Sequence, residues 1–180
     1  MIINMFMFCK NQNKHKVRYV SRMEANLDWL DANLTAEERE LLKTHTHDVS
    51  VWDTFDSIEM LHDILDRIPA TTEQLILYSG AEFAIDQYTF GEMLKLKYFT
   101  SSYSREVAEK YAIQTGRIGV LFVLTIPKGS KFVCLDRISV HGDAEHECLL
   151  DGFNAILKVT RIVGKKEYIE VHADYTVLGW

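Results

Sequence analysis

Glu145-His146-Glu147-Cys148-Leu149-Leu150 is the stretch of this 180-residue chain that most strongly indicates its fold. Its apolar end is typical of a buried strand, which we expect to run from His146 to Leu150. Residues i and i+2 of a strand point to the same face, so Glu145 and Glu147 are expected to project together. Adjacent carboxylates repel each other unless a cation, a hydroxyl group or a substrate lies between them. An isolated Glu-x-Glu is usually a solvated strand edge, but this one stands at the mouth of a buried strand and indicates a site.

Two further motifs carry hydroxyl groups and a glycine. Thr100-Ser101-Ser102 ends an expected strand, and Ser104 is a good N-cap for the helix that follows. Such hydroxyls commonly cap helices, but they can equally orient a catalytic carboxylate or bind a ribose. An expected strand over Gln74–Tyr78 ends in a turn at Ser79-Gly80, where the glycine permits close approach to the backbone. Each motif alone is unspecific, so their order along the chain carries the information.

The hydrophobic pattern divides the chain into a mainly helical part, residues 1–72, and a β-rich part, residues 73–180. Capping-box spacing at Thr35 and a helical apolar period from Thr54 to Pro69 predict two helices. A short helix is also expected around residues 23–30. Residues 81–96 are expected to be mainly loop with a short helix. The absence of a repeat or linker predicts one α+β domain with its helices at the front. Five later strands are expected over Gly119–Ile126, Lys131–Leu135, His146–Leu150, Ala155–Ile162 and Glu167–His172, with hairpin turns at Asp151-Gly152 and Gly164-Lys165-Lys166.

Composition and charge exclude several classes of protein. The fractions of hydrophobic residues, 47%, and charged residues, 26%, are ordinary for a globular domain. A net charge of −6 argues against nucleic acid as a partner, because nucleic-acid binding needs a basic surface. Cys9, Cys134 and Cys148 form an odd set without CxxC spacing, as in reduced intracellular proteins. The apolar start, residues 1–9, lacks the features of a secretory signal and no run approaches a membrane span, so no membrane partner is expected.

Taken in order, the motifs resemble the mono-ADP-ribosyltransferases of the arginine–serine–glutamate class, which include bacterial binary toxins and the Alt and Mod proteins of tailed phages. The resemblance runs from about Leu34 to Val171. It implies an α+β ADP-ribosyltransferase-like fold, with N-terminal helices packed on two small β-sheets that form an NAD cleft. The segments that carry it are Leu34–Leu42, Leu77–Gly80, Phe99–Ser102, Val107–Ala112, Phe122–Gly129, Glu145–Leu150 and Ile156–Val159.

The resemblance implies that ADP-ribose is transferred from NAD to an arginine side chain of a target protein. Glu147 matches the family's catalytic glutamate, which stabilises the positive charge that develops at the ribose anomeric carbon. Ser101 would hydrogen-bond that carboxylate, and Glu145 would hold and deprotonate the acceptor guanidinium. Residues 140–144 would form a mobile loop that recognises the target. The residues expected to bind NAD are Tyr78, Ser79, Gly80, Thr100, Ser102 and Tyr111, the last either by stacking on the nicotinamide or as a core aromatic residue.

Other readings of the sequence are weaker. The phage-type size and the missing signal lead us to expect action on bacterial proteins in the cytoplasm of a host cell. No metal is expected, because His45-x-His47-Asp48 has no further ligand at metal-site spacing and is better explained as a surface cluster. No Walker or GxGxxG motif supports Rossmann-type use of NAD. A glycosidase is disfavoured, because retaining enzymes place their carboxyl groups about 5–5.5 Å apart across the scissile bond, usually on different strands.

The sequence departs from the family pattern at Ser79, where the family carries an arginine that contacts the dinucleotide phosphate and ribose. Its loss removes a charge-assisted contact of about 1.5–3 kcal/mol. Three interpretations stay open: another cation among Arg105, Arg117 and Lys97 takes over; the protein is a catalytically degenerate member that binds a protein or NAD; or position 79 carries an introduced substitution.

Overall fold

The computed structural model describes residues 23–46, 54–81, 88–95, 99–114, 118–152 and 154–178. Its helices are a helix over residues 23–33, α2 (Ala36–His45), α3 (Phe55–Arg67), α4 (Arg105–Ile113) and the 3-10 turn η3 (Gly142–Ala144). Its strands are β1 (Leu75–Ala81), β2 (Met93–Lys95), β3 (Phe99–Ser102), β4 (Gly119–Ile126), β5 (Phe132–Cys134), β6 (Glu147–Leu150), β7 (Ala155–Gly164) and β8 (Tyr168–Val177).

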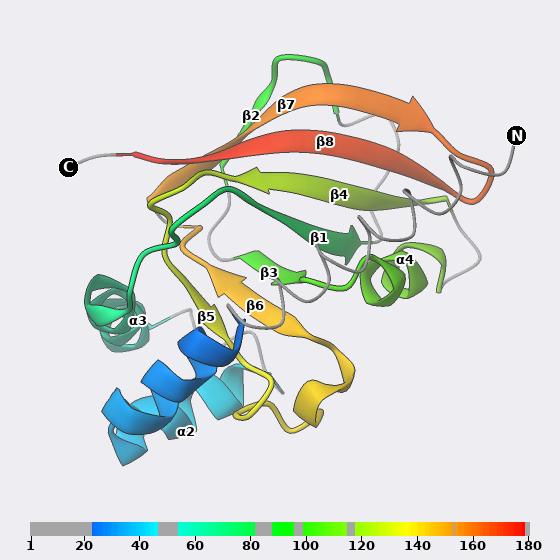
Figure 1. The fold of residues 1–180 in the computed structure, drawn as a ribbon. Coiled ribbons are helices and arrows are strands. Elements are labelled where there is room, and N and C mark those ends of the chain that lie inside the picture. Colours follow the sequence, from blue (N-terminus) through cyan, green and yellow to red (C-terminus); the bar gives the residue numbers. More distant parts are fainter. Residues whose placement is uncertain are drawn as a thin grey trace, which may run out of the picture.

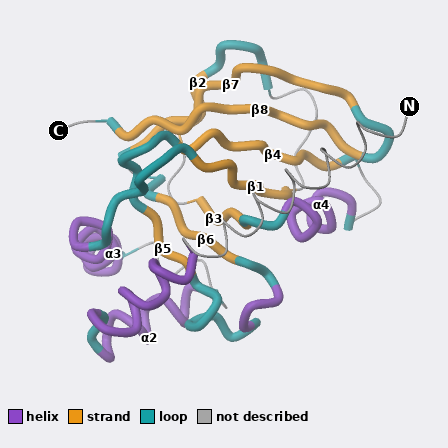
Figure 2. Tube along the Cα trace, in the orientation of Figure 1, coloured by secondary structure: helices purple, strands orange, loops and turns teal. Residues whose placement is uncertain are grey.

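The eight strands form one hydrogen-bonded sheet in the order β2-β7-β8-β4-β1-β3-β6-β5. The expectation of two small sheets is corrected in one respect, because β1 and β3 join the two groups of strands. That junction has one register pair, Tyr78 with Ser102, whereas β1 and β4 pair along the whole of β1. Strands β3, β6 and β5 lie below β1, β4, β8 and β7 in Figures 1 and 2. The α+β fold class is confirmed.

The helical part packs on the β5–β6 end of the sheet (Figure 1). Asn26 joins the first helix to the edge strand: its side-chain nitrogen donates to the Phe132 carbonyl over 3.0 Å, and its oxygen accepts from the Cys134 amide over 2.9 Å. The exposed edge of β5 is thereby capped by a helix side chain. The buried apolar residues of this core come from the helices, these strands and the segments next to them: Leu30, Leu42, Leu61, Ile64, Leu65, Ile68, Val133, Leu135, Ile138 and Leu149.

Several elements form where the sequence predicts them. In the capping box of α2, the Thr35 hydroxyl accepts from the Glu38 amide and the Glu38 carboxylate accepts from the Thr35 amide, over 3.2 and 2.8 Å. The apolar strand β4 is buried because it lies in the middle of the sheet, antiparallel to β1 and parallel to β8. The hairpin between β7 and β8 is also confirmed, with Gly164 paired to Ile169. No helix in the described ranges has the length and apolar character needed to cross a bilayer.

Two expected turns are wrong. β1 does not end at Tyr78 but continues to Ala81, because Ser79 and Gly80 pair with Phe122 and Leu121 of β4. Residues 151–152 are not a hairpin turn: β6 pairs with β3 and β5, whereas β7 pairs with β2 and β8. In residues 81–96 the described part holds the short strand β2 rather than a helix, and the rest of that segment lies outside the described residues.

Two glycines let α4 lie directly on the sheet. A Cβ atom at Gly80 of β1 would stand 1.9 Å from the Ala108 carbonyl oxygen, and a Cβ at Gly119 of β4 would stand 1.9 Å from that of Ala112. Contact at this distance with helix backbone is impossible without moving the helix. The position of α4, and of every side chain that it presents to β1, therefore depends on these glycines.

We predict that Gly119→Ala lowers the free energy of unfolding by about 2–4 kcal/mol, because the added methyl group pushes α4 away from β4. Gly164→Ala is the matched control, since a Cβ there meets nothing within 4 Å and should change stability by less than about 0.5 kcal/mol. Urea unfolding of the three proteins measures the difference. Equal stability of the two variants would contradict the close approach of α4.

Candidate active site

A cavity of about 200 Å³ lies where β1, β3, the start of β6 and α4 meet. The structure brings together around it all nine residues that the sequence predicts for the site. Val107 and Ala108 of α4 also line the cavity and were not predicted. The predicted residues that line it are Tyr78, Ser79, Gly80, Thr100, Ser101, Ser102, Tyr111, Glu145 and Glu147.

Glu147 is the first residue of β6 and pairs with Ser102 of β3. Its side chain is only 13% exposed, and its Oε2 has no hydrogen-bond partner among the described residues. Burial, followed by the negative charge of Glu145, raises the pKa of Glu147 to about 7. His141 acts in the opposite direction and Asp136 adds a further negative charge. The carboxyl group therefore ionises near neutral pH and carries a charge that the protein solvates poorly.

Glu145 is not on the strand, which corrects the expectation that the two glutamates project from one strand face. It lies in the turn after η3, and β6 begins only at Glu147. His146, between them, has a φ of 51°, so the chain turns there through the left-handed region. The two side chains nevertheless reach the same cavity, because the turn redirects Glu145.

The hydroxyl group of Tyr111 donates a hydrogen bond to the Glu145 carboxylate. This contact joins α4 to the turn before β6, and it raises the pKa of Tyr111 to about 12, with burial as a second cause. Of the two roles that the sequence leaves open for Tyr111, the core aromatic residue is wrong, because Tyr111 is 43% exposed and its hydroxyl group contacts Glu145; stacking on the nicotinamide stays a prediction. Tyr111 is thus a partner of Glu145 rather than of Glu147.

The serines bond to backbone rather than to the catalytic carboxylate. Ser101 donates to the Cys148 carbonyl over 3.1 Å, so its expected hydrogen bond to Glu147 is not made. The reason is register: Ser101 is buried directly opposite Cys148. Ser102 donates to the Glu145 carbonyl over 2.8 Å and accepts from the Ser104 amide over 3.0 Å. We call Thr100–Ser102 of β3 the hydroxyl strand. Its serines fix the backbone around both glutamates.

Sequence reasoning missed a cluster beside the turn. Asp136, whose side chain is 6% exposed, accepts a hydrogen bond of 2.5 Å from the Tyr103 hydroxyl. The His146 Nδ1 lies 3.4 Å from the same carboxylate oxygen, and its ring stacks on Tyr103 with centroids 4.5 Å apart. These contacts hold the ring of His146, the left-handed residue that lies between Glu145 and Glu147. The three residues are distant in sequence and share no motif, so no local signal identifies them.

His45, expected in a surface cluster, is buried at the end of α2. Its Nε2 lies 3.8 Å from Oε1 of Glu147, and its side chain is 0% exposed. Burial lowers the pKa of His45 to about 4, so the imidazole is neutral at physiological pH. His47 and Asp48 lie outside the described residues. Within the described part of the chain, no group of three or more His, Cys, Asp or Glu side chains is placed to hold a metal ion.

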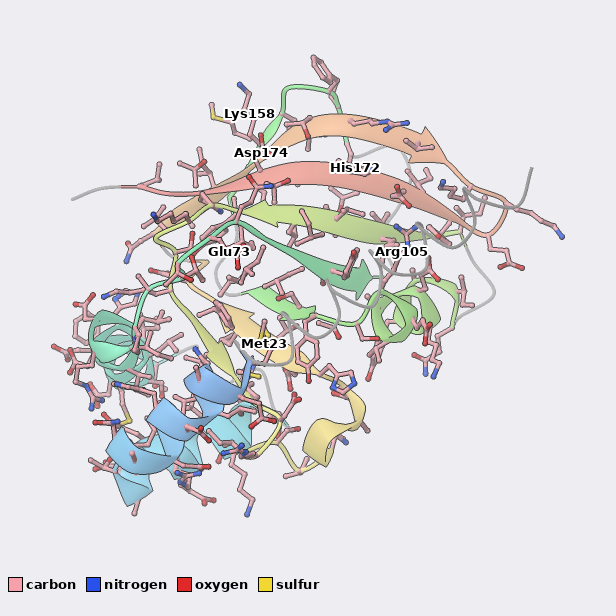
Figure 3. All side chains as sticks on the ribbon, in the orientation of Figure 1. Met23, Glu73, Arg105, Lys158, His172 and Asp174 are labelled. Carbon is pink, nitrogen blue, oxygen red and sulfur yellow. The ribbon has the colours of Figure 1, made fainter. Side chains whose placement is uncertain are left out.

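Among the described residues that line the cavity, none is lysine or arginine. Arg105 of α4 extends toward β8 (Figure 3), and its guanidinium lies 5.9 Å from the ring centroid of Tyr78, which does line the cavity. It donates to Glu109 over 2.7 Å, to the Tyr168 hydroxyl over 3.3 Å and to Glu170. Arg117 and Lys97, the other candidate cations, lie outside the described residues.

Solved structures that are similar to this fold include ADP-ribosyltransferases. Plx2a, an ADP-ribosyltransferase toxin from Paenibacillus larvae, is similar with a TM-score of 0.68 and 18% identity over 93% of this chain and 97% of that chain. C3stau2 from S. aureus, solved with NAD, has a TM-score of 0.65 and 12% identity over 84% and 94%. The Vibrio splendidus Vis toxin, solved with agmatine, has a TM-score of 0.59 and 18% identity over 87% and 83%.

No family model matches the sequence, and no curated protein matches it closely. The structural likeness nevertheless defines the fold: this chain has the α+β fold of the ADP-ribosyltransferase toxins. The finer resemblance to the phage Alt and Mod proteins stays a prediction.

We predict that the free energy of unfolding of Glu147→Gln, compared with that of the wild type, rises between pH 4.5 and pH 8. The rise should be on the order of 1–3 kcal/mol and should make the variant the more stable protein at pH 8. The wild-type pKa is raised in the folded state, so this group's contribution to stability is present below pH 4.5 and lost as the pH rises through about 7. Glutamine does not titrate and avoids that loss.

Urea unfolding at the two pH values measures the effect, with Glu167→Gln on the exposed surface as the control. If the free energy of unfolding of Glu147→Gln depends on pH in the same way as that of Glu167→Gln, the raised pKa of Glu147 is contradicted.

Proposed function

We propose that this chain transfers ADP-ribose from NAD to an arginine side chain of a target protein. The observation that carries the proposal is the meeting of Glu147, Glu145 and the hydroxyl strand in one cavity of this fold. Similarity of fold makes ADP-ribose transfer a reasonable hypothesis, but the argument for it rests on the residues of the cavity.

The residues of the cavity fit the ribose and nicotinamide end of NAD. Glu147 Oε2 has no hydrogen-bond partner among the described residues, so a ligand hydroxyl can donate to it. Gly80 brings the backbone of β1 to the cavity wall, and the Thr100 and Tyr78 side chains line it. A volume of about 200 Å³ is smaller than the roughly 300–1,000 Å³ of most ligand pockets, so it accommodates one end of a dinucleotide rather than the whole.

Glu147 is the group we assign to cleavage of the bond between nicotinamide and ribose. In its ionised form, the carboxylate stabilises the positive charge that develops at the anomeric carbon as neutral nicotinamide leaves. A poorly solvated carboxylate interacts more strongly with that charge than one in water does, because the local dielectric is low. The burial that raises the pKa of Glu147 therefore serves the reaction, at the cost of ionisation only near neutral pH.

Glu145 is assigned to the acceptor. It lines the cavity and its carboxylate already accepts a hydrogen bond from Tyr111, and its remaining lone pairs can accept further bonds from a planar guanidinium. A guanidinium nitrogen forms the new bond to the anomeric carbon, and Glu145 takes the proton that this nitrogen loses. The complex of the Vis toxin with agmatine, itself an alkylguanidine, supports an acceptor of this chemistry.

The pyrophosphate is the part of NAD that the described cavity serves least well, since its lining has no cation. Arg105, behind Tyr78, is the described cation that we assign to this role; it would have to exchange one of its acidic partners for phosphate. The lack of a lining cation also favours a second candidate function, a degenerate member that binds a protein or NAD without turnover. For the active enzyme, we keep a bacterial protein in the cytoplasm as the proposed target.

We predict that the protein incorporates label from NAD labelled in its adenylate part into proteins of a bacterial lysate, and that Glu147→Gln reduces the incorporation by about 100-fold or more. Glu145→Gln should reduce labelling of protein while leaving hydrolysis of NAD measurable, because it contacts only the acceptor. Glu167→Gln is the control with unchanged activity. Mass spectrometry should locate the modification on arginine. Equal labelling by wild type and Glu147→Gln, or modification of another residue type, would contradict the assignment.

We also predict that Ser79→Arg tightens NAD binding about tenfold in calorimetry, since it adds a charge-assisted contact of roughly 1.5 kcal/mol. Ser79→Gln, which adds length without charge, should leave the dissociation constant within about threefold of the wild type. Binding by Ser79→Arg combined with no binding by the wild type would instead favour the degenerate cleft. No tightening would show that the phosphate does not reach residue 79.

A further inference from the structure

His45 reaches the active site from the helical part of the chain. It is the last residue of α2, yet its imidazole is fully buried and its Nε2 is 3.8 Å from Oε1 of Glu147. The sequence predicted that it lies in a surface cluster, and the proposed reaction gives it no role. A buried imidazole against the carboxylate that carries the proposed chemistry needs an explanation.

The neighbours of His45 hold it firmly in this place. Leu42, one turn earlier, is fully buried in the core that α2 shares with β5 and β6. Thr46, the next residue, donates its hydroxyl to the Lys43 carbonyl over 2.7 Å and accepts from the Val140 amide over 3.3 Å. The end of α2 is thus attached both to the sheet and to the segment that leads into Glu145.

Glu147 lacks the hydrogen bond that was expected to orient it. The Ser101 hydroxyl is committed to the Cys148 carbonyl, and Oε2 of Glu147 has no partner in the described structure. The two atoms are 3.8 Å apart, and a side-chain rotation that brings them to 2.7–3.2 Å would make this contact a hydrogen bond. A neutral imidazole can then donate one N–H to the carboxylate without adding a net charge to the site.

We propose that His45 is a positioning residue for Glu147, and that its imidazole orients and stabilises the ionised carboxylate in the place that Ser101 would otherwise take. This inference rests on the proposed function only in naming Glu147 as the reacting carboxylate. The other described titratable groups that interact with Glu147 come from four places: Glu145 and His141 from the turn before β6, Asp136 from the segment after β5, Tyr111 from α4 and the buried thiol of Cys148 from β6 itself.

The neutral state of His45 is consistent with this role. Burial lowers its pKa to about 4, so a full positive charge does not offset the effect of Glu145 on Glu147. The imidazole then supplies one hydrogen bond and a fixed orientation, while the raised pKa of Glu147 is retained. Loss of the donor should raise that pKa further, because the ionised form loses a stabilising partner.

The test compares His45→Gln, whose amide nitrogen can occupy the place of Nε2, with His45→Leu, which fills the space without a donor. For His45→Leu we expect kcat for NAD cleavage to fall about tenfold, with KM for NAD within about threefold of the wild type. The acid limb of its pH–rate profile should move up by about 0.5–1 pH unit. His45→Gln should stay within about threefold of the wild type in kcat, with an unchanged limb.

Leu42→Ala is the matched control, because it damages the same helix away from Glu147; it should lower stability and leave the acid limb in place. The proposal is overturned if His45→Leu and His45→Gln have the same kcat and the same limb, or if Leu42→Ala moves the limb as far as His45→Leu does.

A second measurement does not depend on turnover. The midpoint of Glu147 titration, followed by carbon NMR of glutamate labelled at its carboxyl carbon and assigned with Glu147→Gln, should rise in His45→Leu and not in His45→Gln. If the wild type cleaves no NAD, the proposed function fails, and this titration still decides the role of His45. An unchanged midpoint in His45→Leu would overturn that role even in an active enzyme.

Discussion

The register between β3 and β6 is the constraint on which the rest of the site depends. Ser102 lies opposite Glu147 and Ser101 lies opposite Cys148, so the hydroxyl strand of β3 lies directly beside β6. Because Ser104, two residues further on, caps α4, the same strand also sets where that helix begins. A shift of one residue would turn Glu147 to the other face of the sheet and bring a different residue opposite Ser102.

This register places a carboxylate where its ionised form is poorly solvated. Glu147 begins a strand whose other residues are fully buried, and it has another carboxylate, Glu145, nearby. The apolar packing of Leu149 and Leu150 holds the strand in spite of that cost, and the Asp136 cluster holds the left-handed turn at His146. The site is thus electrostatically unfavourable in isolation and is maintained by the packing around it, as is common where a protein binds or transforms a ligand.

Nine residues of the cavity could be predicted from sequence because they lie in short motifs whose order along the chain resembles a known family, whereas Val107 and Ala108 were not predicted. Glu147, Ser102 and Gly80 are examples, since each of their motifs spans only a few neighbouring residues. The partners within the site could not be predicted in this way. The hydroxyl of Ser101 bonds to Cys148 rather than to Glu147, and Glu145 leaves the strand, because cross-strand register and a non-glycine left-handed residue decide both.

Local sequence patterns are enough to predict an α+β chain with a helical first part, a central buried strand, a helix that begins after Ser104, and a set of acidic and hydroxyl residues able to form a site. Tertiary structure alone decided that the strands join into one sheet through β1 and β3, and that α4 lies on Gly80 and Gly119. It also decided that His45 of α2 faces Glu147. The physical reason is range: periodicity and capping act between near neighbours in sequence, whereas register, helix docking and the burial of a charged group depend on segments that meet only in the folded chain.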